Sequence, residues 1–205
     1  MKPLVLLGCG GHARSVADVA LSAGFDTLLF VDENANPGER ILGFPVQCRM
    51  PAASGGWDYM PCAGDNRRRL AQIRELAARE LPLATVISPT ATIGAEAAVG
   101  PASFVGHHAH IGPLASIGAG CIINTGAVVE HECVIGECSH VAIRACVAGR
   151  SRLGDGVFLG AGAVVIDSIS LASNVIIGAG GVVVAAIDSL GVYVGVPVRR
   201  VANRE

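Results

Sequence analysis

Aromatic residues are scarce in this sequence. Phe, Trp and Tyr make up only 4% of the 205 residues, although 51% of the chain is hydrophobic. A large layered core usually relies on aromatic side chains, because each of them buries a large area. Together with the 27 glycines, this scarcity predicts many small and similar packing layers in place of one broad core.

Strong net charge and long apolar runs are also missing. The formal net charge is −2, which leaves no broad basic field to bind nucleic acid or an anionic membrane. Gly, Pro or a charged residue interrupts every long apolar stretch, so we expect no membrane insertion. Residues 1–8 carry one positive charge and a short apolar core, unlike a signal peptide. We expect them to contain a buried strand of a cytoplasmic protein.

The seven cysteines include no CxxC pair. An odd number of cysteines without metal-type spacing favours reduced, buried thiols over a disulfide framework. We assign none of them a nucleophilic role.

A six-residue repeat dominates the second part of the chain. Every sixth residue from Ile87 to Val183 is Val, Ile or Leu, which gives seventeen positions without a slip in register. Glycine often follows the aliphatic residue, as Gly112 does, and a small residue usually stands four positions after it, as Ala127 does. A period of six fits neither the 3.6-residue period of a helix nor the two-residue alternation of a strand.

This repeat predicts a triangular coil in which each hexad supplies one short strand and one corner. We expect the aliphatic side chain to point inward and the glycine to relieve the backbone at the turn. Three hexads close one coil, so residues eighteen apart stack at about 4.8 Å, the spacing of paired strands. The sequence thus predicts a parallel β-helix of nearly six coils, from about residue 87 to residue 187.

A different pattern precedes the repeat and divides the chain into domains of residues 1–84 and 85–205, the second ending in a C-terminal tail. In the first domain we expect strands at residues 4–7, 27–31, 59–62 and 83–87 and helices at about 12–23 and 67–80. Strands that alternate with helices predict a small, Rossmann-like parallel α/β sheet.

A glycine-rich loop follows the first expected strand. Gly8, Gly10 and Ala13 match the dinucleotide fingerprint G-x-G-x-x-A, and Asp32, followed by Glu33, lies at the offset expected for a ribose contact. Such a loop lets a phosphate approach the backbone at a helix N-terminus. Because the domain is about half the size of a full dinucleotide fold, we expect a nucleotide moiety in place of a nicotinamide cofactor. A purely structural turn is the alternative.

Other polar residues of this domain are candidates for substrate contact. Gly11 and His12 complete the loop, and His12 either contacts the sugar or phosphate or caps the helix. Asn66 and Arg69 are further candidates. The run of three arginines at residues 67–69 is nevertheless more typical of a solvated helix face than of a phosphate clamp.

The two halves together resemble the bacterial sugar acetyltransferases of the NeuD/PglD-like family. The residues that carry the resemblance are Gly8-x-Gly10-Gly11-His12, the run from Asn124 to Glu137, the segment Ser139-His140-Val141 and the tail Val194-Gly195-Val196-Pro197-Val198. The resemblance covers nearly the whole chain. It implies a left-handed β-helix, a homotrimer, and acetyl-CoA bound in the cleft between neighbouring subunits. It also implies a nucleotide-activated amino sugar whose nucleotide part is held by the N-terminal domain.

Acetyl transfer from a thioester needs positioning, a base and an oxyanion site. His131 is the candidate general base, because imidazole is suited to proton transfer near neutral pH. The adjacent Glu132 could orient it if the corner geometry allows; the alternative is an idle surface histidine. By the resemblance, His140 contacts the cofactor or the substrate, the Gly149 N–H donates to the thioester oxygen, and Asn124 helps to seat the sugar.

The leading hypothesis is N-acetylation, by direct attack on acetyl-CoA, of the C4 amino group of a UDP-linked 2-acetamido-4-amino-trideoxyhexose. A GDP-linked 4-amino sugar and a sugar O-acetyltransferase of the sialic-acid type are alternatives. The competing class is a non-catalytic or carbonic-anhydrase-like β-helix protein. His107, His108 and His110 stand at three different hexad positions, so they should diverge, and we expect no metal.

Overall fold

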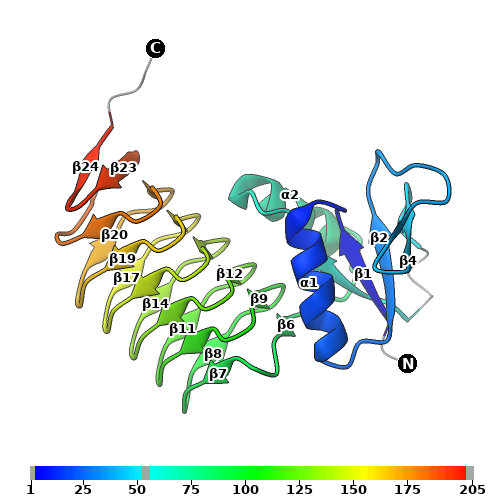
Figure 1. The fold of residues 1–205 in the computed structure, drawn as a ribbon, viewed down its shortest axis with the longest axis horizontal. Coiled ribbons are helices and arrows are strands. Elements are labelled where there is room, and N and C mark those ends of the chain that lie inside the picture. The colour runs from blue at the N-terminus through cyan, green and yellow to red at the C-terminus, as the bar shows by residue number, and fades with distance from the viewer. Residues whose placement is uncertain (1–2, 52–55, 202–205) are drawn as a thin grey trace. The chain divides into compact units, whose positions relative to one another are not determined.

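The computed structural model describes residues 3–51 and 56–201. The chain divides into two compact units, residues 1–89 and residues 90–205, which Figure 1 colours from blue to green and from green to red. The boundary expected from the sequence, after residue 84, lies five residues before this division. Residues 1–2 and 202–205 of the expected domains lie outside the described residues.

The first unit contains a small α/β domain. Its elements are β1 (Pro3–Leu7), α1 (Gly11–Ser22), β2 (Thr27–Val31), β3 (Arg40–Ile41), β4 (Phe44–Gln47), β5 (Asp58–Pro61) and α2 (Asn66–Ala78). The next strand, β6 (Val86–Ile87), belongs to the sheet that also holds β9 (Phe104–Val105). The sheet order of the α/β domain is β3-β4-β2-β1-β5, with β3 antiparallel to β4 and the other pairs parallel. The expected parallel sheet is confirmed, and the structure adds the β3–β4 hairpin, which the sequence did not reveal.

Both helices of this unit bury one side. α1 begins after Gly10 and buries Ala13 and Val16 among others, at the three- and four-residue spacing of an amphipathic helix. α2 begins after Asp65, whose side chain accepts a hydrogen bond from the Arg68 N–H at 2.9 Å. Because β1, β2 and β5 are parallel, the loops that follow them meet at one edge of the sheet, where open α/β sheets bind ligands.

The second unit contains a β-helix with three faces. The first face holds β7 (Thr92–Ile93), β10 (His110–Ile111), β13 (Val128–Val129), β16 (Cys146–Val147), β19 (Val164–Val165) and β22 (Val182–Val183). The second holds β8 (Ala98–Val99), β11 (Ser116–Ile117), β14 (Val134–Ile135), β17 (Arg152–Leu153) and β20 (Ser170–Leu171). The third holds β9 (Phe104–Val105), β12 (Ile122–Ile123), β15 (His140–Val141), β18 (Phe158–Leu159), β21 (Ile176–Ile177), β23 (Val192–Gly195) and β24 (Val198–Arg200), and only β23 and β24 pair antiparallel.

Residues eighteen apart pair on every face, for instance Ile111 with Val129 and Ile117 with Ile135. Figure 1 shows the resulting stack of similar coils. The fold is the left-handed parallel β-helix that the hexad period and the family resemblance predicted.

The turns use glycine differently from our expectation. A residue with positive φ recurs every six positions at the corners, and many of these residues are not glycine, such as Leu114 at 62° and Arg150 at 58°. The glycines that follow the aliphatic residues serve another purpose. A Cβ on Gly112 would lie 2.6 Å from the backbone nitrogen of His131 in the next coil. The expectation that these glycines relieve the turn is wrong; they allow successive coils to approach closely.

The interior of the β-helix is a column of aliphatic side chains, so its stability should depend on each layer. Ile123 is fully buried, and replacing it with alanine leaves a cavity. We expect Ile123→Ala to lower the free energy of unfolding by about 2–5 kcal/mol, measured by chemical denaturation.

The matched control is Ile143→Ala, because the Ile143 side chain is 50% exposed. The same chemical change there should alter the free energy of unfolding by no more than about 0.5 kcal/mol. Equal losses for the two variants would contradict the assignment of the hexad aliphatics to the core.

Candidate active site

His131 and Glu132 lie at the corner between β13 and β14. The imidazole Nδ1 is 3.0 Å from Glu132 Oε2, and the side chains are 41% and 50% exposed. Neighbouring side chains of an extended strand point to opposite faces, but Glu132 has a φ of 58°, which interrupts that alternation. Because a carboxylate only accepts hydrogen bonds, this contact assigns the proton to Nδ1 and leaves the Nε2 lone pair available. The pair has the arrangement of an oriented base.

Gly149 lies one coil beyond His131, and the imidazole packs against it. A Cβ on Gly149 would lie 2.5 Å from both Cε1 and Nε2 of His131, so only glycine leaves room for the ring. Among the residues that the structure describes, the Gly149 N–H has no hydrogen-bond acceptor. Thr125 occupies the hexad position equivalent to Gly149, and its N–H donates to the side-chain oxygen of the preceding residue, Asn124, at 2.8 Å. The residue that precedes Gly149 is Ala148, whose side chain has no acceptor. The Gly149 N–H can therefore donate to an oxyanion.

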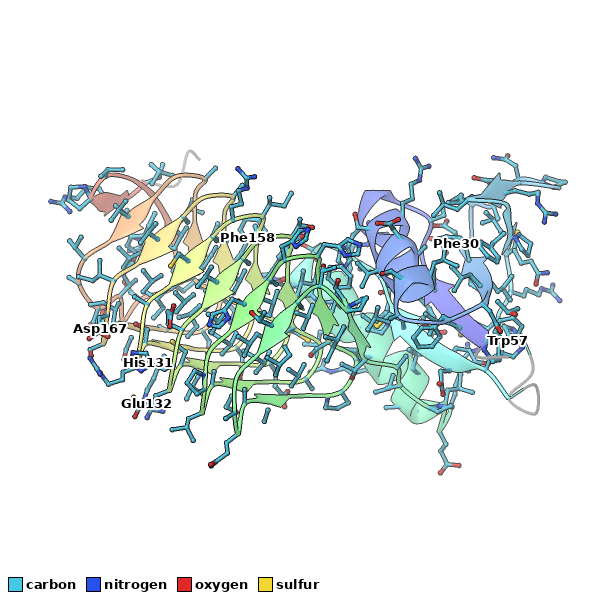
Figure 2. All side chains as sticks on the ribbon, turned by 60° about the horizontal axis from the view of Figure 1, so that its bottom comes forward. Phe30, Trp57, His131, Glu132, Phe158 and Asp167 are labelled. Atoms are coloured by element: carbon cyan, nitrogen blue, oxygen red, sulfur yellow. The ribbon has the colours of Figure 1, made fainter. Side chains whose placement is uncertain are left out.

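Asp167 stands one coil beyond Gly149, within a network of its own. Its Oδ2 accepts hydrogen bonds from Ser168 Oγ at 2.8 Å and Arg150 Nη2 at 2.7 Å. Arg150 Nε also donates to Ser168 Oγ at 3.3 Å. The hydrogen bonds from Ser168 and then Arg150 hold the pKa of Asp167 below its usual range, so the carboxylate is ionised at neutral pH. Figure 2 shows Asp167, His131 and Glu132 along one edge of the β-helix.

His140 lies on β15, in the third face of the β-helix, whereas His131 lies at the corner between the first and second faces. It is 8% exposed, and Phe158 packs edge-on against its ring at a centroid distance of 5.1 Å. The Asn124 amide nitrogen lies 3.2 Å from His140 Nε2. An amide nitrogen donates, so Nε2 is the acceptor in this arrangement. The structure thus brings together Asn124 and His140, two of the expected contact residues.

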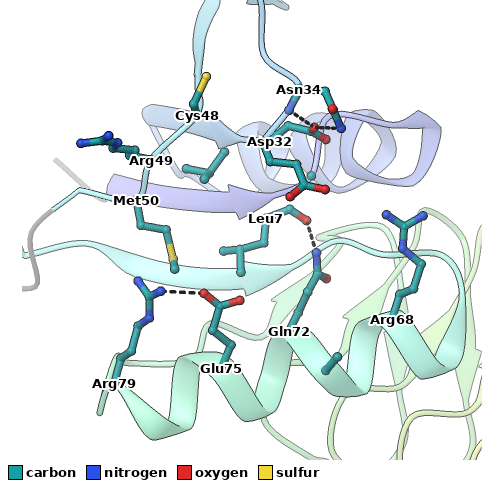
Figure 3. A pocket seen from close by; sticks show the side chains of 14 residues that line it. Leu7, Asp32, Asn34, Cys48, Arg49, Met50, Arg68, Gln72, Glu75 and Arg79 are labelled. Atoms are coloured by element: carbon teal, nitrogen blue, oxygen red, sulfur yellow. Dashed lines mark hydrogen bonds and ion pairs between the residues drawn. The ribbon is translucent and has the colours of Figure 1, made fainter.

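A pocket of about 690 Å³ lies at the edge of the α/β sheet where β1 and β2 end. Figure 3 shows it between the loops after β1 and β2 and the exposed side of α2. Gly8, Asp32 and Glu33 line the pocket, as do Arg68 and Gln72. Gln72 ties α2 to the loop by donating from Nε2 to the carbonyl oxygen of Leu7 at 2.9 Å. The pocket has both signs of charge and the size for part of a nucleotide.

Asp32 is fixed by its neighbours at this edge. The Asn34 N–H donates to Oδ1 at 3.0 Å, and the Cys9 N–H and thiol both lie 3.2 Å from Oδ2. The Asn34 hydrogen bond is the main reason that the pKa of Asp32 is lowered. Burial raises the pKa of the Cys9 thiol, and its contact with Asp32 adds to the effect. Cys9 therefore remains a neutral donor to an ionised carboxylate.

The glycine loop has the backbone that a ligand approach requires. Gly8 has a φ of 114°, a conformation that only glycine adopts easily. A Cβ on Gly10 or Gly11 would meet no atom within 4 Å, so the space beside the loop is open. No side chain caps α1 at Gly10. His12 follows, with its Cβ 3.7 Å from the position that a Cβ on Gly64 would take.

The expectation of a solvated arginine face is wrong for Arg69, which is fully buried. Its Nη1 donates to the carbonyl oxygens of Ala63 at 3.0 Å and Gly64 at 3.3 Å, and its Nη2 donates to Asn66 Oδ1 at 2.8 Å. Arg69 thus braces the loop after β5. Asn66 takes part in this brace and is not among the lining residues of the pocket.

The clustered histidines contact two threonines, and the His108 backbone N–H donates to Thr90 Oγ1 at 3.2 Å. His107 Nδ1 lies 3.2 Å from Thr90 Oγ1, and His110 Nδ1 lies 2.7 Å from Thr92 Oγ1. Within residues 3–51 and 56–201, no three His, Cys, Asp or Glu side chains are grouped to hold a metal ion. In the same part of the chain no helix has the length and apolar character to cross a membrane.

Sequence reasoning missed Arg150, Asp167 and Ser168. Their signal is the coil period of eighteen residues, because His131, Gly149 and Asp167 form one column along the corner. Arg150 and Ser168 belong to the neighbouring column above Glu132. Extending both columns beyond Gly149 would have found them.

Comparison with known proteins relates the whole chain to sugar acetyltransferases. Residues 3–76 match the PglD N-terminal domain family. The acetyltransferase domain of PglB from Neisseria gonorrhoeae FA1090 superposes with a TM-score of 0.93 at 28% identity, over 98% of this chain and 100% of that one. A structure of that domain with acetyl coenzyme A has a TM-score of 0.92 at 28% identity, over 98% and 99% of the two chains.

A second solved relative is a histidine-to-alanine variant of GDP-perosamine N-acetyltransferase from Caulobacter crescentus, in complex with CoA and GDP-perosamine. It has a TM-score of 0.92 at 31% identity, over 99% of this chain and 98% of that one. A hexad β-helix with an oriented corner histidine, preceded by a nucleotide-type α/β domain, defines a hexapeptide-repeat acyltransferase. The chain belongs to the PglD/NeuD-like family of sugar acetyltransferases. The expected family, fold class and acetyltransferase activity are confirmed.

Proposed function

We propose that this protein transfers the acetyl group of acetyl-CoA to the amino group of a nucleotide-activated deoxysugar, with His131 as general base. The observation that carries the proposal is the corner geometry. Glu132 holds Nδ1 of the imidazole at 3.0 Å, and Nε2 faces Gly149, whose N–H is available to an oxyanion. Base and oxyanion donor thus occupy adjacent coils, as acyl transfer requires.

The reaction is a direct displacement without an acyl-enzyme. The sugar amine attacks the thioester carbonyl carbon, a C–N bond forms, and one amine proton passes to His131 Nε2. The Gly149 N–H stabilises the negative charge on the carbonyl oxygen. When the tetrahedral intermediate collapses, the C–S bond breaks and the imidazolium returns its proton to the departing CoA thiolate. Glu132 stabilises the imidazolium between the two proton transfers.

The nucleotide part of the acceptor is proposed to bind at the pocket of the α/β unit. Asp32 and Glu33 line this pocket with Gly8, and the ionised Asp32 carboxylate can accept from a ribose hydroxyl. Gly10, Gly11 and His12 at the start of α1 provide an open, uncapped helix N-terminus for phosphate. Asn66 contributes at most through the loop that it and Arg69 brace.

Two nucleotide sugars are candidates for the acceptor. The first is a UDP-linked 2-acetamido-4-amino-trideoxyhexose. The second is a GDP-linked 4-amino sugar, which is favoured by the 31% identity to the GDP-perosamine enzyme over nearly the whole of both chains.

A homotrimer is part of the proposal. Apolar side chains such as Leu114 and Val184 are 55% and 48% exposed on the β-helix, and a subunit contact would cover surface of this kind. Because His140 lies on a different face from His131, one subunit would supply the base and its neighbour the Asn124–His140 pair that contacts the cofactor or the sugar. Sedimentation equilibrium tests the subunit number.

The test of the proposed function is release of free thiol from acetyl-CoA in the presence of one acceptor at a time. The panel consists of UDP- and GDP-linked 4-amino sugars, the matching 4-hydroxy sugars, and sialic acid. We expect release with at least one amino sugar, and mass spectrometry of the product should show one added acetyl group. If no amine supports release, or if only hydroxyl acceptors do, the N-acetyltransferase assignment is wrong.

A further inference from the structure

Asp167 is a charged group near His131 to which the reaction described above gives no role. We propose that its carboxylate binds the amino group of the acceptor sugar next to His131 and thereby makes the site selective for amines over hydroxyls. This inference rests on the proposed function and adds a specificity-determining residue to it.

The first support is the way in which the carboxylate is held. Both printed donors, Arg150 Nη2 at 2.7 Å and Ser168 Oγ at 2.8 Å, bind the same oxygen, Oδ2. The other oxygen, Oδ1, accepts from no group in the described part of the chain. The side chain is about half exposed, so Oδ1 is held in place and accessible to a ligand.

The second support is the distance between Oδ1 and the base. The position of a Cβ on Gly149 lies 3.0 Å from Asp167 Oδ1 and 2.5 Å from His131 Nε2. Laid end to end, these two distances place the two atoms no more than about 5.5 Å apart. One nitrogen atom in front of Gly149 could therefore form a hydrogen bond of 2.7–3.2 Å to each of these two atoms at the same time. A single amine can therefore contact both atoms.

The third support is the number of hydrogens on the nucleophile. An attacking amine has at least two N–H groups, so it can give one proton to His131 Nε2 while another N–H donates to Asp167 Oδ1. A hydroxyl has one hydrogen, which the base requires, and its oxygen lone pairs would then face the carboxylate. Such a mismatch is how a polar site rejects an acceptor.

Charge acts in the same direction. An amine carries a positive charge in water before it reacts, and a carboxylate binds an ammonium group through a charge-assisted hydrogen bond. The bound ammonium releases one proton to solvent before the neutral amine attacks and gives a second proton to His131. Glu130 and Glu132 also lie beside His131, so the surroundings of the base are acidic. The positively charged Arg150 belongs to the same cluster, but its guanidinium binds Oδ2 of Asp167 and not Oδ1.

The test compares Asp167→Asn with wild-type enzyme. We expect the KM for the amino sugar to rise about tenfold to a hundredfold, while kcat changes less and the KM for acetyl-CoA stays within twofold. The increase should shrink as the pH rises past the point where the sugar amine loses its charge, because the lost interaction is with the ammonium form. An unchanged melting temperature would show that the fold is intact.

The matched control is Asp155→Asn, which makes the same change at the corner between β17 and β18. Asp155 Oδ1 accepts from the Glu137 N–H at 2.8 Å, and the asparagine oxygen can still do so, so we expect no change in either KM. An acceptor KM within twofold of wild type in Asp167→Asn, or an equal rise in the KM for acetyl-CoA, would overturn the inference.

Calorimetry separates failure of this inference from failure of the proposed function. Binding of a 4-amino nucleotide sugar to the CoA-bound protein should be tenfold or more weaker in Asp167→Asn, whereas the 4-hydroxy analogue should lose no affinity. This difference in Kd needs no turnover. An enzyme that binds the amine through Asp167 without acetylating it would refute only the proposed function. Equal Kd values in an active enzyme would refute only the role of Asp167.

Discussion

Replacing His131 with alanine is expected to lower kcat/KM for acetyl transfer by a factor of about 10² to 10⁴, the usual contribution of a general base. The physical reason is that the imidazole is the oriented acceptor beside the Gly149 N–H. Thiol release under saturating acetyl-CoA measures the effect. Added free imidazole should restore part of the lost rate, because the cavity left by the ring faces solvent.

The matched control is His108→Ala. His108 is exposed and lies at a corner of the β-helix, so the same side chain is removed from the surface; unlike His131, it has a positive φ, 57°. Its kcat/KM should stay within about twofold of wild type. If His131→Ala also retained near-normal kcat/KM, the proton would have to go elsewhere and the mechanism proposed for this corner would be wrong.

Gly149→Ala is expected to reduce kcat by about a hundredfold, although it adds only a methyl group. The new Cβ would lie 2.5 Å from two atoms of the imidazole, and the ring must move by an ångström or more to restore ordinary contact. A displacement of that size costs about 10² in rate when the reacting groups are prealigned. The melting temperature should change little, because the ring is half-exposed and can swing into solvent.

A double variant distinguishes this explanation from a general loss of structure. If Gly149→Ala acts by displacing the imidazole, it should cause little further loss in an enzyme that already carries His131→Ala, because neighbouring changes of this kind are not additive. Fully multiplicative losses would contradict the steric explanation.

The architecture could be predicted from the sequence because each hexad by itself specifies one short strand and the side chain that points inward. An aliphatic residue at every sixth position specifies the inward face, and no competing period is present from Ile87 to Val183. The corner at Glu132 was harder, since adjacent side chains ordinarily diverge. Only the left-handed backbone at that residue, with a φ of 58°, shows that its carboxylate reaches the imidazole.

Other features depended on contacts between distant parts of the chain. The burial of Arg69 follows from the carbonyl groups of the loop that precedes α2, which a helical pattern does not show. The β3–β4 hairpin lies in a stretch with many turn-forming residues and few aliphatic ones. Asp167 lies thirty-six residues from His131, and only the stacking of coils makes them neighbours. Its role, like that of the other proposed site residues, stays a prediction.

The unbroken register also limits how this site can evolve. Groups on one corner are separated along the axis of the β-helix only in whole steps of about 4.8 Å, so the coil spacing fixes the distances between them. An insertion of one or two residues would rotate every later side chain to another face, whereas an insertion of eighteen would only lengthen the prism. New specificities for the acceptor or the acyl donor should therefore arise by substitution of side chains at fixed positions in the coils, or by addition of whole coils. Gradual adjustment of the distance between base, oxyanion donor and carboxylate is not open to this fold.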